Sequence, residues 1–176
     1  NITFVIDNHE KYTSNYDSEK EKETVNFVEA IDEAGVKTIV YAPYRKHIDN
    51  IVQRLEADGK DGIAVAYHSG LTADSKNLAY NSFKDNETKV MISTKAFGMG
   101  VDIPDIQLVY HHAPSGLLPD YVQEVGRAAR KPEIQGFAAL SYAIEDQRYS
   151  KILHGISALR QYQIREVLNK IYKIFE

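Results

Sequence analysis

Two arginines in the segment QEVGRAAR, residues 123–130, have the chemistry to bind phosphate. On a helix, Gln123, Arg127 and Arg130 stand at positions i, i+4 and i+7, so their side chains share one face. The guanidinium group has planar, forked donors that suit phosphate oxygens. Two interpretations stay open. The arginines aim at the γ-phosphate of a nucleotide, or they form a solvated basic face paired with Glu124 or Glu133.

The segment STKAFGMGVDIP, residues 93–104, follows an apolar run typical of a buried strand. Gly98 and Gly100 allow a ligand to approach the backbone closely. Thr94 offers a hydroxyl and a backbone N–H to a phosphate, and Asp102 is placed to accept bonds from a ribose hydroxyl or an arginine. A plain glycine-containing turn explains the same residues.

Two further segments follow apolar runs. Tyr44 and Arg45 come after one run, where the ring could stack on a base and the guanidinium could meet a phosphate. His68 and Gly70 come after the next run, and His68 either positions a phosphate or supports its loop. A charged helix start and a structural histidine explain these residues as well.

The elements that position these residues alternate along the chain. Apolar runs rich in β-branched residues predict strands at 2–6, 37–42, 63–67, 89–93, 107–111 and 136–142. Helical spacing predicts helices at 19–34, 44–57, 72–84, 119–129 and in the tail from 152 onward. Strands without a polar face, alternating with helices, predict an α/β fold with a parallel sheet covered on both sides. Ligands of such folds bind at the carboxyl ends of the strands.

The ends and buried faces of three of these helices are also predicted. Gly35 stands at the C-cap of the first helix, and Thr72 at the N-cap of the 72–84 helix. The apolar faces are expected to comprise Leu78, Ala79 and Phe83 in the 72–84 helix, and Val122, Val125 and Ala129 in the 119–129 helix.

Composition limits the class of protein. The 176 residues suffice for one domain, and the formal net charge of −4 means that any nucleic-acid contact must be local. The absence of cysteine fits a reducing, cytoplasmic location, and no apolar run is long enough to span a membrane. His111 and His112 lack a third ligand at a suitable spacing, so no metal site is expected. Because the first residue is Asn1 and not Met, we expect a piece of a longer protein.

Taken in order, these segments resemble the C-terminal RecA-like domain of superfamily two helicases, and most closely the RecQ family. Residues 37–55 are similar to helicase motif four, 67–71 to the histidine-glycine element, 93–104 to motif five and 123–130 to motif six. The resemblance implies a three-layer RecA-like domain with a mostly parallel sheet over residues 1–150, followed by a C-terminal helical extension over 151–176.

The resemblance further implies the second motor domain of an ATP-dependent helicase. ATP and Mg²⁺ would be held mainly by an N-terminal RecA-like domain of the same polypeptide, since this sequence has no phosphate-binding loop. Arg127 and Arg130, set by Gln123, would reach the triphosphate, with Gly100 and Asp102 at the nucleotide cleft. The residues expected to face the nucleic-acid backbone are Thr94, Tyr44, Arg45, His68 and Gly70.

The sequence also departs from the RecQ pattern. It has Asp102 where Asn is usual, Ala129 where Gly is usual, Lys131-Pro132 where Asp-Gly is usual, and no cysteines for a zinc domain. The Gln-Glu-x-Gly-Arg pattern favours DNA over RNA, because motif six of DEAD-box RNA helicases begins with His-Arg. The alternatives are an RNA helicase half, a helicase-derived binding module without motor activity, or a small-molecule enzyme on a doubly wound fold.

Overall fold

The fold is one parallel sheet covered by helices. The computed structural model describes residues 1–9, 15–97 and 103–157. Within these residues the strands pair in the order β1-β6-β5-β2-β4-β3, and every pair is parallel. The strands are β1 (Ile2–His9), β2 (Thr38–Tyr41), β3 (Ala64–Tyr67), β4 (Val90–Ser93), β5 (Leu108–His111) and β6 (Gly136–Ala143). The predicted α/β class is confirmed.

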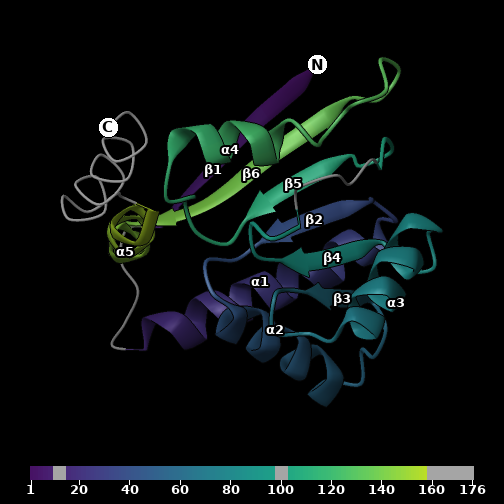
Figure 1. The fold of residues 1–176 in the computed structure, drawn as a ribbon, viewed down its shortest axis with the longest axis horizontal. Coiled ribbons are helices and arrows are strands. Elements are labelled where there is room, and N and C mark those ends of the chain that lie inside the picture. The colour runs from purple at the N-terminus through teal and green to yellow at the C-terminus, as the bar shows by residue number, and fades with distance from the viewer. Residues whose placement is uncertain (10–14, 98–102, 158–176) are drawn as a thin grey trace, which may run out of the picture.

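Helices cover both faces of the sheet (Figure 1). They are α1 (Tyr16–Glu33), α2 (Arg45–Ala57), α3 (Ala73–Lys84), α4 (Leu118–Val125) and α5 (Gln147–Ser157). Val40 and Ile92 point toward the apolar side chains of α1 and α2. Their neighbours Ile39 and Met91 pack against Phe83 of α3 on the opposite face. This alternation explains why the central strands β2, β4 and β5 are buried along their whole length.

The N-cap at Thr72 is confirmed, the C-cap of α1 is Ala34, one residue before the predicted Gly35, and one position predicted to be buried is exposed. The Thr72 Oγ1 accepts a hydrogen bond from the Ser75 N–H at 3.1 Å, and Gly35 has a φ of 66° just after α1. In α3, Ala79 and Phe83 are buried as expected. Leu78 is 72% exposed, because it lies one position away from the i, i+4 pair that faces the sheet.

The helix predicted at 119–129 is shorter than expected. α4 ends at Val125, and Ala129 adopts a φ of 56°, outside the helical region. The Ala129 N–H donates instead to the Ile106 carbonyl at 3.0 Å, so the chain turns toward the segment that precedes β5. The predicted common helical face of Gln123, Arg127 and Arg130 is therefore wrong, as is the predicted anchoring through Val122, which is 61% exposed.

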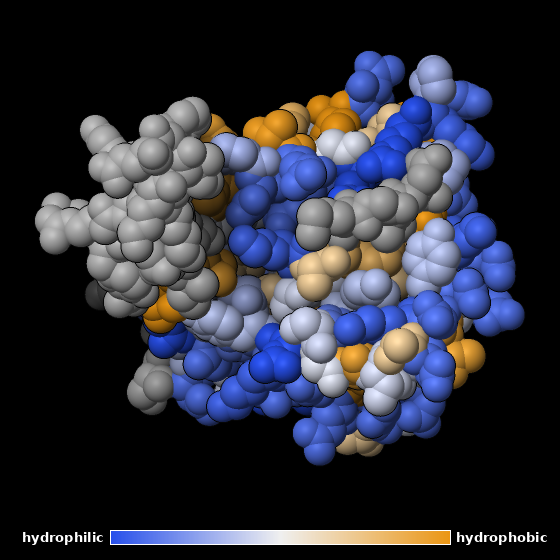
Figure 2. Space-filling view, in the orientation of Figure 1, coloured by the Kyte–Doolittle hydropathy of each residue, from blue (hydrophilic) through white to orange (hydrophobic). Residues whose placement is uncertain are grey.

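The edge of the sheet at β1 is less covered than its centre. Phe4 and Ile6 of β1, and Leu118 and Val122 of α4, are exposed. The space-filling view shows hydrophobic residues along this edge of an otherwise mostly hydrophilic face (Figure 2).

A fully buried ion pair joins α1 to the 3-10 turn that follows β6 (Ile144–Asp146). Lys20 and Asp146 each have 0% of their surface exposed, and their Nζ and Oδ2 atoms are in contact. The Lys20 Nζ also donates to the Ser141 carbonyl at 3.2 Å, and the Asp146 carboxylate accepts from the Tyr16 hydroxyl and the Ala143 N–H. Burial lowers the pKa of Lys20, while the Asp146 carboxylate raises it.

The C-terminal part is described only as far as Ser157. The helical tail predicted beyond this point lies outside the described residues, and the predicted boundary between 150 and 151 falls inside α5 and stays a prediction. Among the helices that the structure describes, none is long and apolar enough to cross a membrane.

Candidate functional site

The four strands β5, β2, β4 and β3 end in a single row. Tyr41 pairs with His111 on one side and Ser93 on the other, and Ser93 pairs with Tyr67. The Ser93 hydroxyl also donates to the Tyr67 carbonyl at 2.7 Å. Because the strands are parallel, the loops that follow them leave from the same edge of the sheet. The motif segments that are far apart in sequence therefore meet there.

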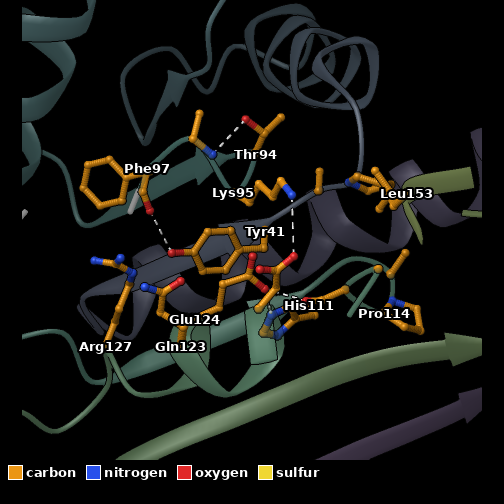
Figure 3. A pocket seen from close by; sticks show the side chains of 17 residues that line it. Tyr41, Thr94, Lys95, Phe97, His111, Pro114, Gln123, Glu124, Arg127 and Leu153 are labelled. Carbon is orange, nitrogen blue, oxygen red and sulfur yellow. Dashed lines mark hydrogen bonds and ion pairs between the residues drawn. The ribbon is translucent and has the colours of Figure 1, made fainter. Parts of the chain in front are cut away.

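A pocket of about 510 Å³ opens at this edge (Figure 3). Its wall comes from the ends of β2 and β5, the turn after β4, α4 and one side chain of α5. The lining residues used below are Tyr41, Thr94, Phe97, Gln123, Glu124 and Arg127. Two residues of the predicted arginine motif, Gln123 and Arg127, thus lie in the same pocket as Thr94 from motif five.

Arg127 is the buried cation of this pocket. Only 3% of its surface is exposed, although it lies in the turn after α4. Arg127 lines the pocket beside Tyr41, whose hydroxyl donates to the Phe97 carbonyl at 3.1 Å (Figure 3). Burial raises the pKa of Tyr41 well above its usual range, so the phenol stays protonated and neutral.

Arg130 occupies a different environment from Arg127. It is exposed, and it follows Ala129, whose left-handed backbone turns the chain away from the helical path. Among the described residues, Arg127 lines the pocket and Arg130 does not. The structure therefore brings only one of the two predicted arginines into the pocket, and the role of Arg130 stays a prediction.

Glu124 holds the turn at residues 126–129, here called the arginine turn, in place. Its carboxylate is buried and accepts a hydrogen bond from the His111 Nε2 at 2.9 Å and another from the Ser115 hydroxyl. The backbone N–H of Arg127 donates to the backbone carbonyl of Glu124 at 3.2 Å. Glu124 and Tyr41 were not among the predicted site residues. The tyrosine was hidden in an apolar strand, and the glutamate was considered only as a partner of the arginines.

Gly136, at the start of β6, packs closely against the arginine turn at Ala128 and Ala129. A Cβ atom at this position would lie 2.7 Å from the Cβ of Ala129 and 3.2 Å from the Cβ of Ala128. The absence of a side chain at the start of β6 therefore lets the arginine turn sit directly on the sheet.

Thr94 shapes the turn after β4. Its hydroxyl oxygen accepts from the Ala96 N–H at 3.3 Å, and its carbonyl accepts from the Phe97 N–H at 3.1 Å. The side chain of Lys95 is exposed and lies 3.5 Å from the Asp120 carboxylate. Thr94 is thus a half-buried residue at the rim of the pocket. The predicted site residues Gly100 and Asp102, and Gly98 with them, lie outside the described residues.

Three residues that are predicted to contact nucleic acid lie close together at the end of β3. They are Arg45, His68 and Gly70. The His68 Nδ1 accepts from the Gly70 N–H at 3.2 Å, and its Nε2 lies 2.9 Å from an Asp49 carboxylate oxygen. Since the Nδ1 is an acceptor, the Nε2 carries the proton in the neutral ring. A Cβ on Gly70 would stand 2.8 Å from an Arg45 guanidinium nitrogen, so Arg45 packs directly over Gly70. His68 is buried and supports this arrangement.

The ring of Tyr44 packs against two other rings. The ring is stacked on His47, with centroids 5.9 Å apart, and meets Tyr149 of α5 edge-on at 5.6 Å. It also packs against the small hydrophobic cluster around Tyr16 and Ala113. Tyr44 is half-buried by these contacts, and its stacking on a base stays a prediction.

Comparison with known proteins identifies the domain. The helicase conserved C-terminal domain family matches residues 19–132. The ATP-dependent DNA helicase Q1 of Pongo abelii is 34% identical over 118 residues, which cover 64% of this chain and 18% of that protein. The ATP-dependent DNA helicase RecQ of Bacillus subtilis is 40% identical over 98 residues, covering 56% and 16%. The chain thus spans less than a fifth of either relative.

Solved structures show the same fold. Domain 2 of the DEAD-box helicase Mss116p, bound to an RNA duplex, superposes with a TM-score of 0.66 over 86% of this chain and 58% of that one, at 20% identity. The predicted RecA-like fold and the resemblance to RecQ-type helicases are confirmed. From the family match, the chain belongs to the helicase conserved C-terminal domain family.

Proposed function

We propose that this chain is the second motor domain of an ATP-dependent nucleic-acid helicase. In this proposal Arg127 and Arg130 contact the triphosphate of ATP that an upstream RecA-like domain of the same polypeptide holds. The observation that carries the proposal is that Arg127 lines a pocket with Gln123 and Thr94, at the edge of the sheet where ligands of α/β folds bind. The proposal is supported by the two similar proteins that are named ATP-dependent DNA helicases.

The arginines would act by electrostatics. Charge on the γ-phosphate oxygens must be neutralised as the phosphoryl group moves to water, and a preorganised guanidinium does this without reorganising at the moment of reaction. The turn held by Glu124 would keep Arg127 in place before ATP arrives. Mg²⁺ and most ATP contacts are assigned to the upstream domain, whose approach on ATP binding would deliver the arginines.

Nucleic acid would bind along the ends of β3 and β4. Thr94 offers its hydroxyl at the pocket rim, while Arg45 lies exposed over Gly70. The net charge of −4 makes such local contacts necessary, since the domain as a whole does not attract phosphates. We propose DNA as the substrate because the two relatives are named as DNA helicases. RNA is the alternative outcome of the binding measurements below.

Comparing the isolated chain with the full-length protein tests whether the ATP site is shared between this domain and an upstream domain. We expect the full-length protein to hydrolyse ATP in the presence of single-stranded DNA, and the isolated chain to show neither ATP hydrolysis nor duplex unwinding. Robust ATP hydrolysis by the isolated chain would contradict the proposal. A full-length protein that binds nucleic acid without hydrolysing ATP would favour the alternative of a binding module.

Substituting Gly70 tests the nucleic-acid surface. In Gly70→Ala the new methyl group displaces Arg45, so we expect the dissociation constant for single-stranded DNA to rise about 3- to 10-fold, as for one lost phosphate contact. Fluorescence anisotropy at two salt concentrations measures this change, and the variant should show a shallower salt dependence. Gly155→Ala is the matched control, because a Cβ there meets nothing within 4 Å. If both variants bind single-stranded DNA with equal affinity, Arg45 does not contribute to the nucleic-acid surface.

A further inference from the structure

Helix α4, which leads into the arginine turn, has few apolar contacts with the rest of the domain. It is eight residues long, and a helix of this length is not stable by itself. Two of its apolar side chains, Leu118 and Val122, are exposed. The buried residues of α4 are Glu124 and Val125, at its C-terminal end. The position of the arginine turn therefore depends on what holds these two residues.

The Glu124 carboxylate is held by two donors from outside α4. Its Oε2 atom accepts from the His111 Nε2 at 2.9 Å and from the Ser115 hydroxyl. His111 is the last residue of β5, and Ser115 lies in the loop between β5 and α4. A buried carboxylate needs hydrogen bonds, and bonds to an ionised group are stronger than bonds between neutral groups. One oxygen atom therefore joins the helix to both the sheet and the loop.

The donor from His111 is fixed by the packing of its ring. His111 is buried, and its ring contacts the Tyr41 ring, with centroids 5.4 Å apart, and the Tyr121 ring at 4.9 Å. Because a carboxylate only accepts hydrogen bonds, the Nε2 atom carries the hydrogen. Within the part of the chain that the structure describes, the Nδ1 atom has no hydrogen-bond partner. The sheet thus presents one fixed N–H to Glu124.

The donor from Ser115 belongs to a segment that also lines the pocket. Residues 113–116 are pocket residues, as is Glu124. Ser115 is half-buried, and its hydroxyl can donate one bond, which the carboxylate accepts. The carbonyl of the same glutamate accepts from the backbone N–H of Arg127 at 3.2 Å. The hydroxyl, the carboxylate and the arginine turn therefore form a continuous series of contacts along one wall of the pocket.

We propose that Ser115 is a positioning residue for Arg127 and acts through the carboxylate of Glu124. With His111 as its one donor, the carboxylate could turn about that bond. The second donor, from the loop, fixes its orientation and with it the end of α4, where the arginine turn begins. This inference rests on the proposed function, which assigns Arg127 to the triphosphate. Small displacements matter there, because a misplacement of about 1 Å can change a rate on the order of 10²-fold.

Ser115→Ala in the full-length protein tests this role, because it removes one donor and leaves His111 and Glu124 in place. We expect kcat for ATP hydrolysis with single-stranded DNA to fall about 3- to 10-fold, as for one lost hydrogen bond, while the KM for ATP stays within about twofold of wild type. Ser82→Ala is the matched control. Ser82 is also half-buried, its hydroxyl bonds Thr88 at 2.9 Å, and neither residue lines the pocket. The control should keep the wild-type kcat, and the two variants should unfold at similar temperatures.

A double-variant cycle separates this route from a direct contact between Ser115 and a ligand. Glu124→Ala should lower kcat about 10²-fold, and adding Ser115→Ala should lower it no further, because the hydroxyl then has no carboxylate to hold. Glu124→Gln should keep more activity than Glu124→Ala, since the amide oxygen can accept the same bonds.

Two results would overturn the positioning role. One is a wild-type kcat in Ser115→Ala, and the other is a double variant in which the two single losses multiply. If Arg127→Ala keeps full turnover, the proposed function itself fails. If Arg127→Ala is inactive while Ser115→Ala behaves as wild type, only the positioning role fails.

Discussion

Replacing Arg127 by alanine in the full-length protein is expected to reduce kcat for ATP hydrolysis by about 10³-fold or more. The guanidinium would neutralise charge that develops on the γ-phosphate, and its burial in a pocket strengthens this effect because little water competes. ATP binding should change little, since the proposed function assigns most contacts with the nucleotide to an upstream domain. Steady-state turnover and equilibrium binding of a fluorescent ATP analogue measure the two quantities separately.

Two companion variants sharpen this prediction. Arg127→Lys keeps the charge without the planar fork, so we expect it to recover only part of the lost rate. Arg54→Ala is the matched control, because Arg54 lies on α2 and contacts Ser18 and Glu21, away from the pocket. Unchanged ATP turnover in Arg127→Ala would show that Arg127 is not a catalytic residue.

The largest expected effect on stability comes from the buried pair of Lys20 and Asp146. Lys20→Ala leaves the Asp146 carboxylate fully buried without its cation, and we expect a loss of about 3–5 kcal/mol in the free energy of unfolding. The loss should appear as a lower urea midpoint with an unchanged slope. The contacts of Asp146 with Tyr16 and Ala143 cannot replace the ammonium charge.

A double variant distinguishes the ion pair from simple packing. Lys20→Met combined with Asp146→Leu removes both charges and fills the space, so it should be more stable than either single variant. Gly155→Ala is the control with the opposite expected sign, because alanine at this open position inside α5 favours the helix and should raise the stability slightly. A loss below about 1 kcal/mol in Lys20→Ala would show that the pair behaves like an exposed salt bridge.

The three central strands could be predicted from the sequence because the helices on both faces of the sheet leave them no polar face. β2, β4 and β5 are buried at every position, so their residues form continuous apolar runs with clear ends. The end of α4 could not be predicted in this way. The bond from the Ala129 N–H to the Ile106 carbonyl depends on how the chain returns to the sheet, and no local pattern records it.

The candidate site was predicted in part. The order of the segments after the strands identified Thr94, Gln123 and Arg127, which do meet in one pocket. Tyr41 was missed because its ring belongs to an apolar strand, and its hydrogen-bond partner Phe97 lies 56 residues further along the chain. The contacts of Tyr44 could not be predicted for a similar reason, since the ring that meets it edge-on belongs to Tyr149 of α5.

Binding of ADP with aluminium fluoride, compared with binding of ATP, most directly tests whether Arg127 stabilises the transition state. The fluoride complex imitates the charge of the phosphoryl group in transfer, and groups that act on the transition state bind such analogues more tightly than the substrate. In the full-length protein with single-stranded DNA, Arg127→Ala should bind ADP–aluminium fluoride about 10²- to 10³-fold more weakly than wild type, with similar affinity for ATP. Equal affinity of wild type and variant for the fluoride complex would contradict the account.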